Sequence, residues 1–323
     1  MREILNVSGV TVDYDRRGER VRAVSGVDLT LNSGEILGLV GESGCGKSTL
    51  GKAIVGILKS SNGEVIFDGE KVAKLTRGQR PKHFRNLQMV FQDPYGSLNP
   101  RRKIGAQIAD GLVVGGTSKK DALVAAGELL EKVGLPGNAV DRYPHEFSGG
   151  QRQRISIARA LAASPTAIVA DEPISALDTS SQAQVANLLV NLVEEYDMGM
   201  VFISHDLSIV RRISDRVAVM YLGKIVEIGT VDQIWSNPTH PYTRALISAI
   251  PHADGTGIMP QDLPGDVPNP MSPPSGCRFH PRCALAIPEC SEVEPAFIQL
   301  QDGRSVACHL QTKENESFSL THS

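Results

Sequence analysis

The residues from Gly41 to Ser48 read GESGCGKS, a pattern that joins three glycines to a lysine and a hydroxyl group. Glycines let the backbone curl so that successive N–H groups point inward, and a following helix adds its positive N-terminal end. Such a loop forms a nest for phosphate oxygens, in which Lys47 reaches the β- and γ-phosphates and Ser48 offers its hydroxyl to Mg²⁺. The alternative is a glycine-rich turn, but the apolar runs on both sides favour the phosphate site.

Two carboxylates follow a second apolar run. Residues 166–173 read TAIVADEP, so a strand that ends at Asp171 and Glu172 places both acids at one strand end. One carboxylate can hold the Mg²⁺ shell and the other can take a proton from water. An acidic pair after a strand is ordinarily the start of a loop. The phosphate loop in the same chain favours the catalytic interpretation.

A third stretch, FSGGQRQRISIARALAA at residues 147–163, carries a pair of glycines near its start. Ser148 is a favourable N-cap for this helix, and the apolar residues recur at helical spacing. Gly149 and Gly150 leave backbone N–H groups free to bind a ligand, which makes a second possible phosphate-binding site. Because this site is not part of the chain's own phosphate loop, we expect a dimer with nucleotide sandwiched at its interface. An ordinary glycine turn is the alternative.

The elements that carry these residues alternate between strands and helices. Apolar runs at 35–41, 166–171 and 199–203 predict buried strands, whereas residues 48–58 and 181–196 show helical spacing. This alternation predicts a parallel sheet with helices on its faces, whose ligands bind at the carboxyl ends of the strands. Gly41, Asp171 and His205 fall at such ends. Residues 216–229 predict a hairpin that turns near Leu222 and Gly223.

Composition restricts the class of protein. The 323 residues have a formal net charge of -3, with 41% hydrophobic and 21% charged residues, which is typical of a soluble globular protein. There is no long basic block, so no nucleic-acid-binding face is predicted. The charged start lacks a signal peptide, and no window approaches ~18 uninterrupted apolar residues. We therefore expect a cytoplasmic protein that meets a membrane only through a partner.

Four motifs together resemble the ATP-binding cassette (ABC) ATPases: GESGCGKST, FSGGQRQRISIARAL, VADEPISALD and FISHD. The resemblance implies an α/β fold, in which a phosphate-loop core with a mixed sheet flanked by helices carries an inserted helical subdomain. A small cysteine-containing C-terminal extension follows. We place the nucleotide-binding domain at 1–250, its helical subdomain at about 93–163 and the extension at 251–323. Six prolines in residues 259–276 predict an extended segment.

The resemblance also implies roles for single residues. Tyr14 would stack on adenine, and the triphosphate and its metal would be wrapped by Gly41, Ser43, Gly44, Cys45, Gly46, Lys47, Ser48 and Thr49. Mg²⁺ would be held through Ser48, Gln92 and Asp171. The catalytic residues would be Glu172 as general base, His205 at the γ-phosphate and Gln92 at the attacking water. The nucleotide of the other subunit would be bound by Ser148, Gly149 and Gly150, with Asp178 at the subunit contact.

Two of these roles have structural alternatives. Tyr14 could be a surface tyrosine, because the residues DRRGERVR beside it can shift the loop. His205 could be a packing histidine at a strand end. No catalytic position is degenerate, which argues against a regulatory subunit without turnover. A non-transport ABC ATPase is a further alternative, but it needs a second cassette, a coiled coil or a DNA-binding insert, and none is visible.

A narrower resemblance covers nearly the whole chain. The stretches VFQDPYGSLNPRRKIG, RYPHEFSGGQRQ, NPTHPYTRAL and PSGCRFHPRCALAIPEC resemble the ATPase subunits of bacterial dipeptide and oligopeptide importers, specifically the second of two paired ATPases. The implied partners are a paralogous ATPase, two membrane permeases that dock near Gln92, and an extracytoplasmic substrate-binding protein. The implied place is the cytoplasmic face of the inner membrane. Nickel, glutathione, oligosaccharides or siderophores are alternative cargoes.

Five cysteines without a signal peptide argue against a disulfide framework. Cys45 lies in the phosphate loop and reads as a small filler. The other four gather near the C-terminal end, at Cys277, Cys283, Cys290 and Cys308. Four thiolates can bind zinc or an iron–sulfur cluster, and their spacing does not distinguish between the two. Zinc remains an alternative because His280 and His309 are further possible ligands. Buried thiols without a metal are the third possibility. The narrower resemblance favours a structural [4Fe–4S] cluster bound by all four cysteines.

Overall fold

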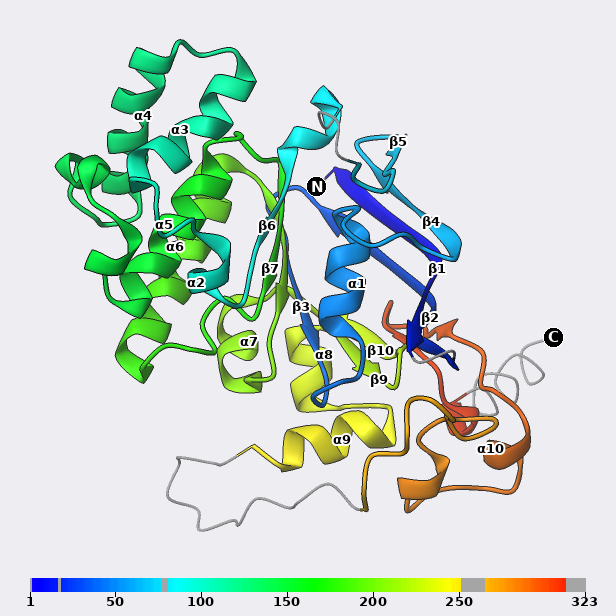
Figure 1. Ribbon diagram of the computed structural model, residues 1–323. Coiled ribbons are helices and arrows are strands. Elements are labelled where there is room, and N and C mark those ends of the chain that lie inside the picture. The colour runs from blue at the N-terminus through cyan, green and yellow to red at the C-terminus, as the bar shows by residue number, and fades with distance from the viewer. Residues whose placement is uncertain (1, 17–18, 77–80, 251–264, 312–323) are drawn as a thin grey trace.

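The computed structural model of the chain describes residues 2–16, 19–76, 81–250 and 265–311. Two sheets and a group of helices make up the molecule (Figure 1). The predicted α/β class is confirmed, as are the helices between 93 and 163 and the hairpin at Leu222 and Gly223. Both turn residues of this hairpin have positive φ, 40° and 84°, as tight two-residue turns require.

The larger sheet has eight strands in the order β11-β12-β10-β9-β3-β8-β7-β6. Its parallel part comprises β3 (Ile36–Val40), β6 (Leu87–Val90), β7 (Ala167–Asp171), β8 (Gly199–Ile203) and β9 (Arg216–Tyr221). Its antiparallel edge comprises β10 (Lys224–Thr230), β11 (Ile298–Gln299) and β12 (Ser305–Val306). The sheet is therefore mixed, and its parallel strands are buried on both faces, as continuous apolar runs indicate.

A second, four-stranded antiparallel sheet covers the N-terminal side, and sequence reasoning did not predict it. Its order is β2-β1-β4-β5, with β1 (Glu3–Arg16), β2 (Glu19–Asn32), β4 (Asn62–Phe67) and β5 (Glu70–Lys71). Helix α1 (Lys47–Ile54) packs between the two sheets, against β1, β2, β7 and β8. A core of both sheets and α1 thus holds the start of α1 in place.

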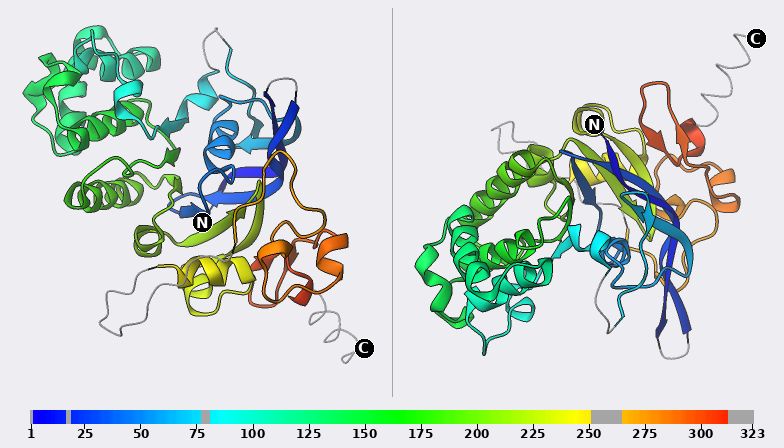
Figure 2. Two further views of the ribbon diagram at one scale, coloured as in Figure 1. Left: turned by 60° about the horizontal axis from the view of Figure 1, so that its bottom comes forward. Right: turned by 90° about the horizontal axis from the view of Figure 1, so that it is seen from above.

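The remaining helices lie on the far face of the large sheet, in the C-terminal segment, or in the helical subdomain, which stands apart from the strands in both views of Figure 2. The helices between 93 and 163 are α2 (Pro94–Ser97), α3 (Ile104–Gly115), α4 (Lys119–Lys132) and α5 (Gly149–Leu161). The later ones are α6 (Thr179–Tyr196), α7 (Leu207–Ile213), α8 (Val231–Ser236), α9 (Pro241–Ser248) and α10 (Glu289–Glu292). Among the residues described, none of these helices is long and apolar enough to cross a membrane.

The C-terminal segment joins the core. Strand β12 extends the large sheet through β10, where Val306 lies opposite Glu227. Arg304 donates to the carbonyl of Asn237 at 2.6 Å and to the hydroxyl of Thr239 at 2.7 Å, which ties the segment to the α8–α9 connection. Residues 265–276 contain neither helix nor strand, and residues 259–264 of the proline-rich stretch lie outside the described ranges. The segment from 265 is thus built into the sheet edge.

Candidate functional site

The phosphate loop connects β3 to α1 in a conformation that only glycine accommodates. Gly46, the N-cap of α1, has φ of 110°, and a Cβ there would lie 2.3 Å from the carbonyl oxygen of Ala23. A Cβ at Gly41 would lie 2.1 Å from the carbonyl oxygen of Met220. No side chain caps the N-terminus of α1. The backbone N–H groups there are consequently left for a ligand.

Lys47 is folded back onto its own loop. Its Nζ donates to the carbonyl oxygens of Gly41 at 2.7 Å and Glu42 at 3.0 Å, and it lies 3.7 Å from Sγ of Cys45. The side chain is buried and has no carboxylate partner in these bonds. A phosphate oxygen in the loop can replace the two carbonyls, because a charge-assisted bond to an anion is stronger than one to a neutral carbonyl.

Ser48 and Asp171 meet across the start of α1 and the end of β7. The Ser48 hydroxyl donates to Oδ1 of Asp171 at 2.7 Å. Burial raises the pKa of Asp171 above its ordinary value, although the bond from Ser48 and the nearby Lys52 charge act against it. A hydroxyl and a carboxylate side by side are hard oxygen donors of the kind that Mg²⁺ takes, so these two residues fit the implied metal.

Glu172 lies at the centre of the polar groups at the strand ends. Gln92 Nε2 donates to Oε2 of Glu172 at 2.8 Å, and Nδ1 of His205 lies 3.4 Å from Oε1. Glu172 itself has φ of 45°, a left-handed conformation that costs a non-glycine residue on the order of 1 kcal/mol. The fold therefore holds this carboxylate in a strained backbone position where a glutamine and a histidine converge on it.

The loop and the strand ends enclose one cavity of about 490 Å³. Its lining includes nine residues that the sequence singled out, and the full set is Ala23, Ser43, Gly44, Gly46, Lys47, Ser48, Thr49, Gln92, Glu172 and His205. Ala23, from β2, was missed, and an alanine carries no sequence signal for such a place. Tyr14 lies beside the cavity: its hydroxyl is 3.2 Å from Oγ1 of Thr49, and the side chain is 37% exposed.

The glycines at the start of α5 lie elsewhere in the molecule. Ser148, Gly149 and Gly150 are not among the residues lining the cavity. The Ser148 hydroxyl accepts the N–H of Gln151 at 3.3 Å, and Oε1 of Gln151 accepts the N–H of Ser148 at 2.9 Å. This reciprocal capping box satisfies part of the helix N-terminus. The remaining N–H groups and the exposed hydroxyl face solvent.

Asp178 caps the neighbouring helix α6. Its carboxylate accepts the N–H of Ser181 at 3.0 Å and the hydroxyls of Ser180 and Ser181. The hydroxyl of Ser180, followed by the N–H and hydroxyl of Ser181, lowers the pKa of Asp178 to about 2. Gly150 lies against Ser181, where an added Cβ would be 3.2 Å from its hydroxyl oxygen. The starts of α5 and α6 therefore form one polar surface.

The four C-terminal cysteines line one small cavity. Cys277, Cys283, Cys290 and Cys308 surround a space of about 10 Å³, together with His280 and His309. Burial raises the pKa of Cys277 to about 11, and it raises the pKa of Cys283 and Cys308 as well. In the described part of the chain, no three His, Cys, Asp or Glu side chains are arranged to hold a metal ion. Thiols and imidazoles are metal ligands by residue type. The side chains as placed, however, surround a space that is only about as large as one water molecule needs.

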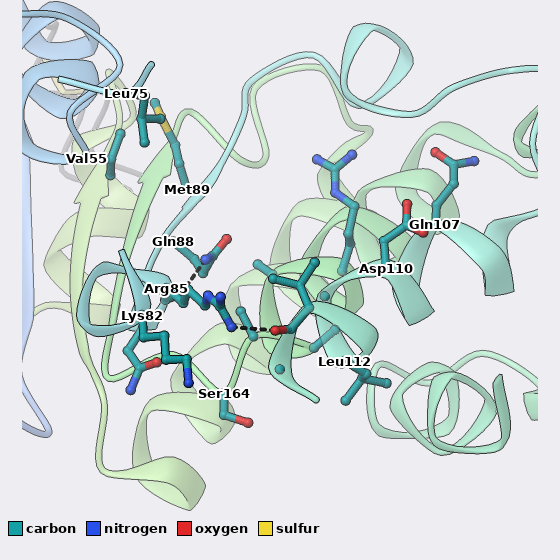
Figure 3. A pocket seen from close by; sticks show the side chains of 18 of the residues that line it. Val55, Leu75, Lys82, Arg85, Gln88, Met89, Gln107, Asp110, Leu112 and Ser164 are labelled. Carbon is teal, nitrogen blue, oxygen red and sulfur yellow. Dashed lines mark hydrogen bonds between the residues drawn. The ribbon is translucent and has the colours of Figure 1, made fainter. Parts of the chain in front are cut away.

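A larger groove of about 930 Å³ separates the helical subdomain from the sheet (Figure 3). Val55, Leu75 and Met89 form an apolar end, and Leu112 lies across from Arg85 and Lys82. Nη1 of Arg85 donates to the carbonyl of Val114, whereas its Nε is buried and has no hydrogen-bond partner among the described residues. Phe91 lines the groove and the next residue, Gln92, lines the cavity of about 490 Å³, so neighbouring residues of the chain face both spaces.

Known proteins are related to this chain in sequence and in fold. Residues 24–175 match the ABC transporter family, and residues 226–290 match the oligopeptide/dipeptide transporter C-terminal region. The oligopeptide transport ATP-binding protein AppF of Bacillus subtilis is 47% identical over 302 residues, 92% of each chain.

Two solved structures are similar in fold. A dimeric post-hydrolysis ATP-binding cassette bound to ADP and Pi aligns with a TM-score of 0.64 and 30% identity, covering 70% of this chain and 98% of that one. The protein cbiO1 from Clostridium perfringens, part of the ABC transporter complex cbiONQ, aligns with a TM-score of 0.63 and 27% identity, covering 73% and 92%.

Proposed function

The chain belongs to the ABC transporter family, in its oligopeptide and dipeptide branch, and from that premise we propose that it is the ATP-hydrolysing subunit of a peptide importer. The observation that carries the proposal is the convergence of Lys47, Glu172 and His205 on one cavity at the start of α1. The proposal includes the roles of single residues, the partner subunits and the cargo.

Binding of MgATP would begin at the uncapped start of α1. Lys47 exchanges the carbonyls of its loop for β- and γ-phosphate oxygens, and the loop N–H groups hold the same phosphates. Ser48, Asp171 and Gln92 would hold Mg²⁺, which neutralises charge on the phosphates. Tyr14 is proposed to stack on adenine from its half-exposed place beside Thr49.

Hydrolysis needs a water positioned opposite the γ-phosphate. Glu172 would accept the proton of that water at its carboxylate, while Gln92 Nε2, which now donates to Glu172, orients the water. His205 would contact the γ-phosphate and stabilise charge that develops on it. The strain at Glu172 is consistent with a carboxylate kept in one orientation by its backbone.

The second half of the site would come from another subunit. Ser148, Gly149 and Gly150 lie outside the cavity, so they would serve the nucleotide of a partner, with Asp178 at the contact. We propose that this partner is a paralogous ATPase. Support comes from the dimer of the related post-hydrolysis cassette, which is 30% identical.

The groove between the sheet and the helical subdomain is the proposed docking site for a helix of a membrane permease. Two such permeases, each with one helix, would place the ATPase pair on the cytoplasmic face of the inner membrane. The groove has an apolar end around Met89 and the cations Lys82, Arg85 and Arg159. Burial lowers the pKa of Arg159, whose guanidinium donates to the carbonyl of Ser97. We therefore expect a helix with an apolar stripe and a carboxylate.

A cysteine cross-link tests this docking. Leu112→Cys places a thiol on the groove, whereas Val124→Cys places one on the outer surface of α4, where Val124 is 62% exposed. In a complex with the permeases, we expect the first thiol, and not the second, to cross-link to a permease loop. Equal cross-linking from both positions, or none from Leu112→Cys, contradicts the proposal. The unsubstituted chain controls for its native cysteines.

Peptide is the proposed cargo, delivered by an extracytoplasmic binding protein. The complex of this chain, its paired ATPase, both permeases and the binding protein is reconstituted in vesicles with MgATP on the cytoplasmic side. We expect ATP-dependent uptake of a labelled dipeptide or pentapeptide, and loss of uptake with Glu172→Gln. Uptake of nickel or glutathione in place of both peptides would overturn the peptide assignment while leaving the ATPase assignment intact.

For the C-terminal cysteines we propose a structural [4Fe–4S] cluster held by Cys277, Cys283, Cys290 and Cys308. Support comes from the four thiols, which line one cavity although 30 residues lie between the first cysteine, Cys277, and the last, Cys308. The small cavity, about 10 Å³, favours a single zinc ion as the alternative. Absorbance near 400 nm with iron and sulfide after anaerobic purification supports the cluster, whereas a colourless, zinc-loaded protein supports the alternative. Metal-free protein of full stability contradicts both.

A further inference from the structure

A carboxylate sits inside the phosphate loop. Glu42 is the second residue of GESGCGKS, and three of its groups are held. Its N–H donates to the hydroxyl of Tyr242 at 2.9 Å, and its carbonyl accepts from Lys47 at 3.0 Å. Its side chain is absent from the lining of the nucleotide cavity, so the carboxylate is turned to the back of the loop.

The carboxylate is held there by an arginine from the C-terminal segment. Arg282 donates to Oε2 of Glu42 at 2.7 Å and to Oε1 at 3.0 Å, a two-bond fork across 240 residues. The arginine side chain is 4% exposed and the glutamate side chain 18%. A bidentate guanidinium–carboxylate pair is both stronger and more directional than a single bond. The arginine is buried and the glutamate largely so, which shields the ion pair from most of the solvent.

The arginine is itself packed in place by aromatic rings. Phe279 contacts Tyr221 and Tyr242, with ring centroids 5.3 Å apart in each case. The guanidinium of Arg282 lies 5.8 Å from the centroid of the Tyr221 ring and 5.9 Å from that of Phe279. Tyr242 is also the residue whose hydroxyl accepts the Glu42 N–H. One cluster therefore fixes the backbone and the side chain of Glu42 together.

An unpaired carboxylate at this position would oppose the ligand of the loop. A triphosphate brings several negative charges to the other side of the same peptide segment, and like charges at short range repel most strongly where water is excluded. We propose that Arg282 is a positioning residue of the nucleotide site, which neutralises Glu42 and anchors the phosphate loop to the C-terminal segment. The segment between Cys277 and Cys283 thereby becomes part of the ATP site.

The test is a charge-rescue cycle on the full chain, with Kd for MgATP measured by a fluorescent nucleotide analogue. Arg282→Met leaves Glu42 charged and unpaired, so we expect MgATP to bind about tenfold more weakly. Glu42→Gln in the same chain removes that charge, and we expect the double variant to recover most of the lost affinity. In steady-state hydrolysis we expect the loss to appear mainly as a higher KM for MgATP and less as a lower kcat, because neither side chain lines the cavity.

A matched control comes from the same segment. Arg278 is also partly buried, but it donates to the carbonyl of Leu222 and the hydroxyl of Ser25 and contacts no acidic side chain of the loop. Glu42→Gln should therefore rescue Arg282→Met and not Arg278→Met. Thermal unfolding of each variant separates weak binding from loss of folded protein.

The inference rests on the proposed ATP site, and the outcomes keep the two apart. If the unsubstituted chain fails to bind MgATP, the proposed function fails. If it binds MgATP and Arg282→Met binds equally well, only the role of Arg282 is overturned. A double variant that stays as weak as the single one also overturns that role, because charge would then not be the cause.

Discussion

Glycines stand at the starts of both α1 and α5, but the two helix starts are completed in different ways. At α1 the N-cap is Gly46 in a left-handed conformation, and no side chain bonds the first N–H groups. At α5 the N-cap is Ser148 in an extended conformation, and Ser148 and Gln151 satisfy each other's N–H groups. The first helix start is left open, whereas the second is capped by its own residues.

This difference separates two kinds of phosphate contact. An open helix start surrounded by Lys47, Ser48 and Asp171 can bind an anion and its metal by itself. A self-capped start with an exposed hydroxyl can add contacts only to a nucleotide that is already held elsewhere. We therefore expect substitutions near α1 to affect binding and chemistry in the isolated chain, and substitutions near α5 to affect only the dimer.

The largest effect is expected at the carboxylate beside α1. Glu172→Gln keeps the acceptor of the Gln92 bond but cannot take a proton from water, so kcat should fall about 100- to 10,000-fold. MgATP should still bind, because Glu172 is proposed to contact the water and not the phosphates. Steady-state hydrolysis and a binding titration on one preparation measure both. Hydrolysis near the rate of the unsubstituted chain would refute the base assignment.

The next effect concerns the start of α5. Gly149→Asp puts a carboxylate where the partner's phosphates are proposed to lie, so hydrolysis by the assembled dimer should fall about 100-fold. An acidic side chain in the first turn interacts favourably with the positive end of the helix dipole, so the variant should still fold. Binding of MgATP to the isolated chain should not change. Weaker binding by the isolated variant would mean that α5 serves its own nucleotide.

A stability measurement contrasts the two glycines directly. Gly46→Ala would bring a Cβ to 2.3 Å from the Ala23 carbonyl at φ of 110°, and should cost about 2 kcal/mol of unfolding free energy. In Gly149→Ala the nearest atom to the new Cβ is Cδ2 of Leu177 at 3.8 Å, an ordinary contact, and alanine is the better helix former. Urea unfolding should therefore show a loss for the first variant and none for the second. Equal losses would contradict the structural difference.

Much of this site could be predicted because it depends on short local patterns. The loop from Gly41 to Ser48 and the acids at Asp171 and Glu172 each follow an apolar strand, and strand ends meet at one edge of a parallel sheet. The roles of Gln92 and His205 came from family resemblance, although the apolar run before it already placed His205 at a strand end. Their contacts with Glu172 were not predicted.

The parts that could not be predicted depend on long-range packing. The strands β1 and β2 carry bulges that interrupt their alternation, and nothing in either strand indicates that α1 will pack on it. The extension predicted as a small tail pairs with β10 through β12, a strand of only two residues. Arg282 and Glu42 are 240 positions apart, so their ion pair has no signature in either segment.

The smallest expected effect is a pH dependence at the open helix start. Burial raises the pKa of Asp171, so the folded chain binds a proton more tightly there than the unfolded chain, whose pKa is about 3.9. Asp171 therefore stabilises the fold at pH values below its pKa in the unfolded chain. This contribution is lost as the pH rises through its higher pKa in the folded chain. Asp171→Asn keeps an oxygen acceptor for Ser48 and removes that penalty, so without nucleotide the variant should gain unfolding free energy at neutral pH and none near pH 3. Asp178, whose pKa is lowered, should show the opposite trend, and matching pH profiles for both asparagine variants would contradict the opposite pKa shifts of these two carboxylates.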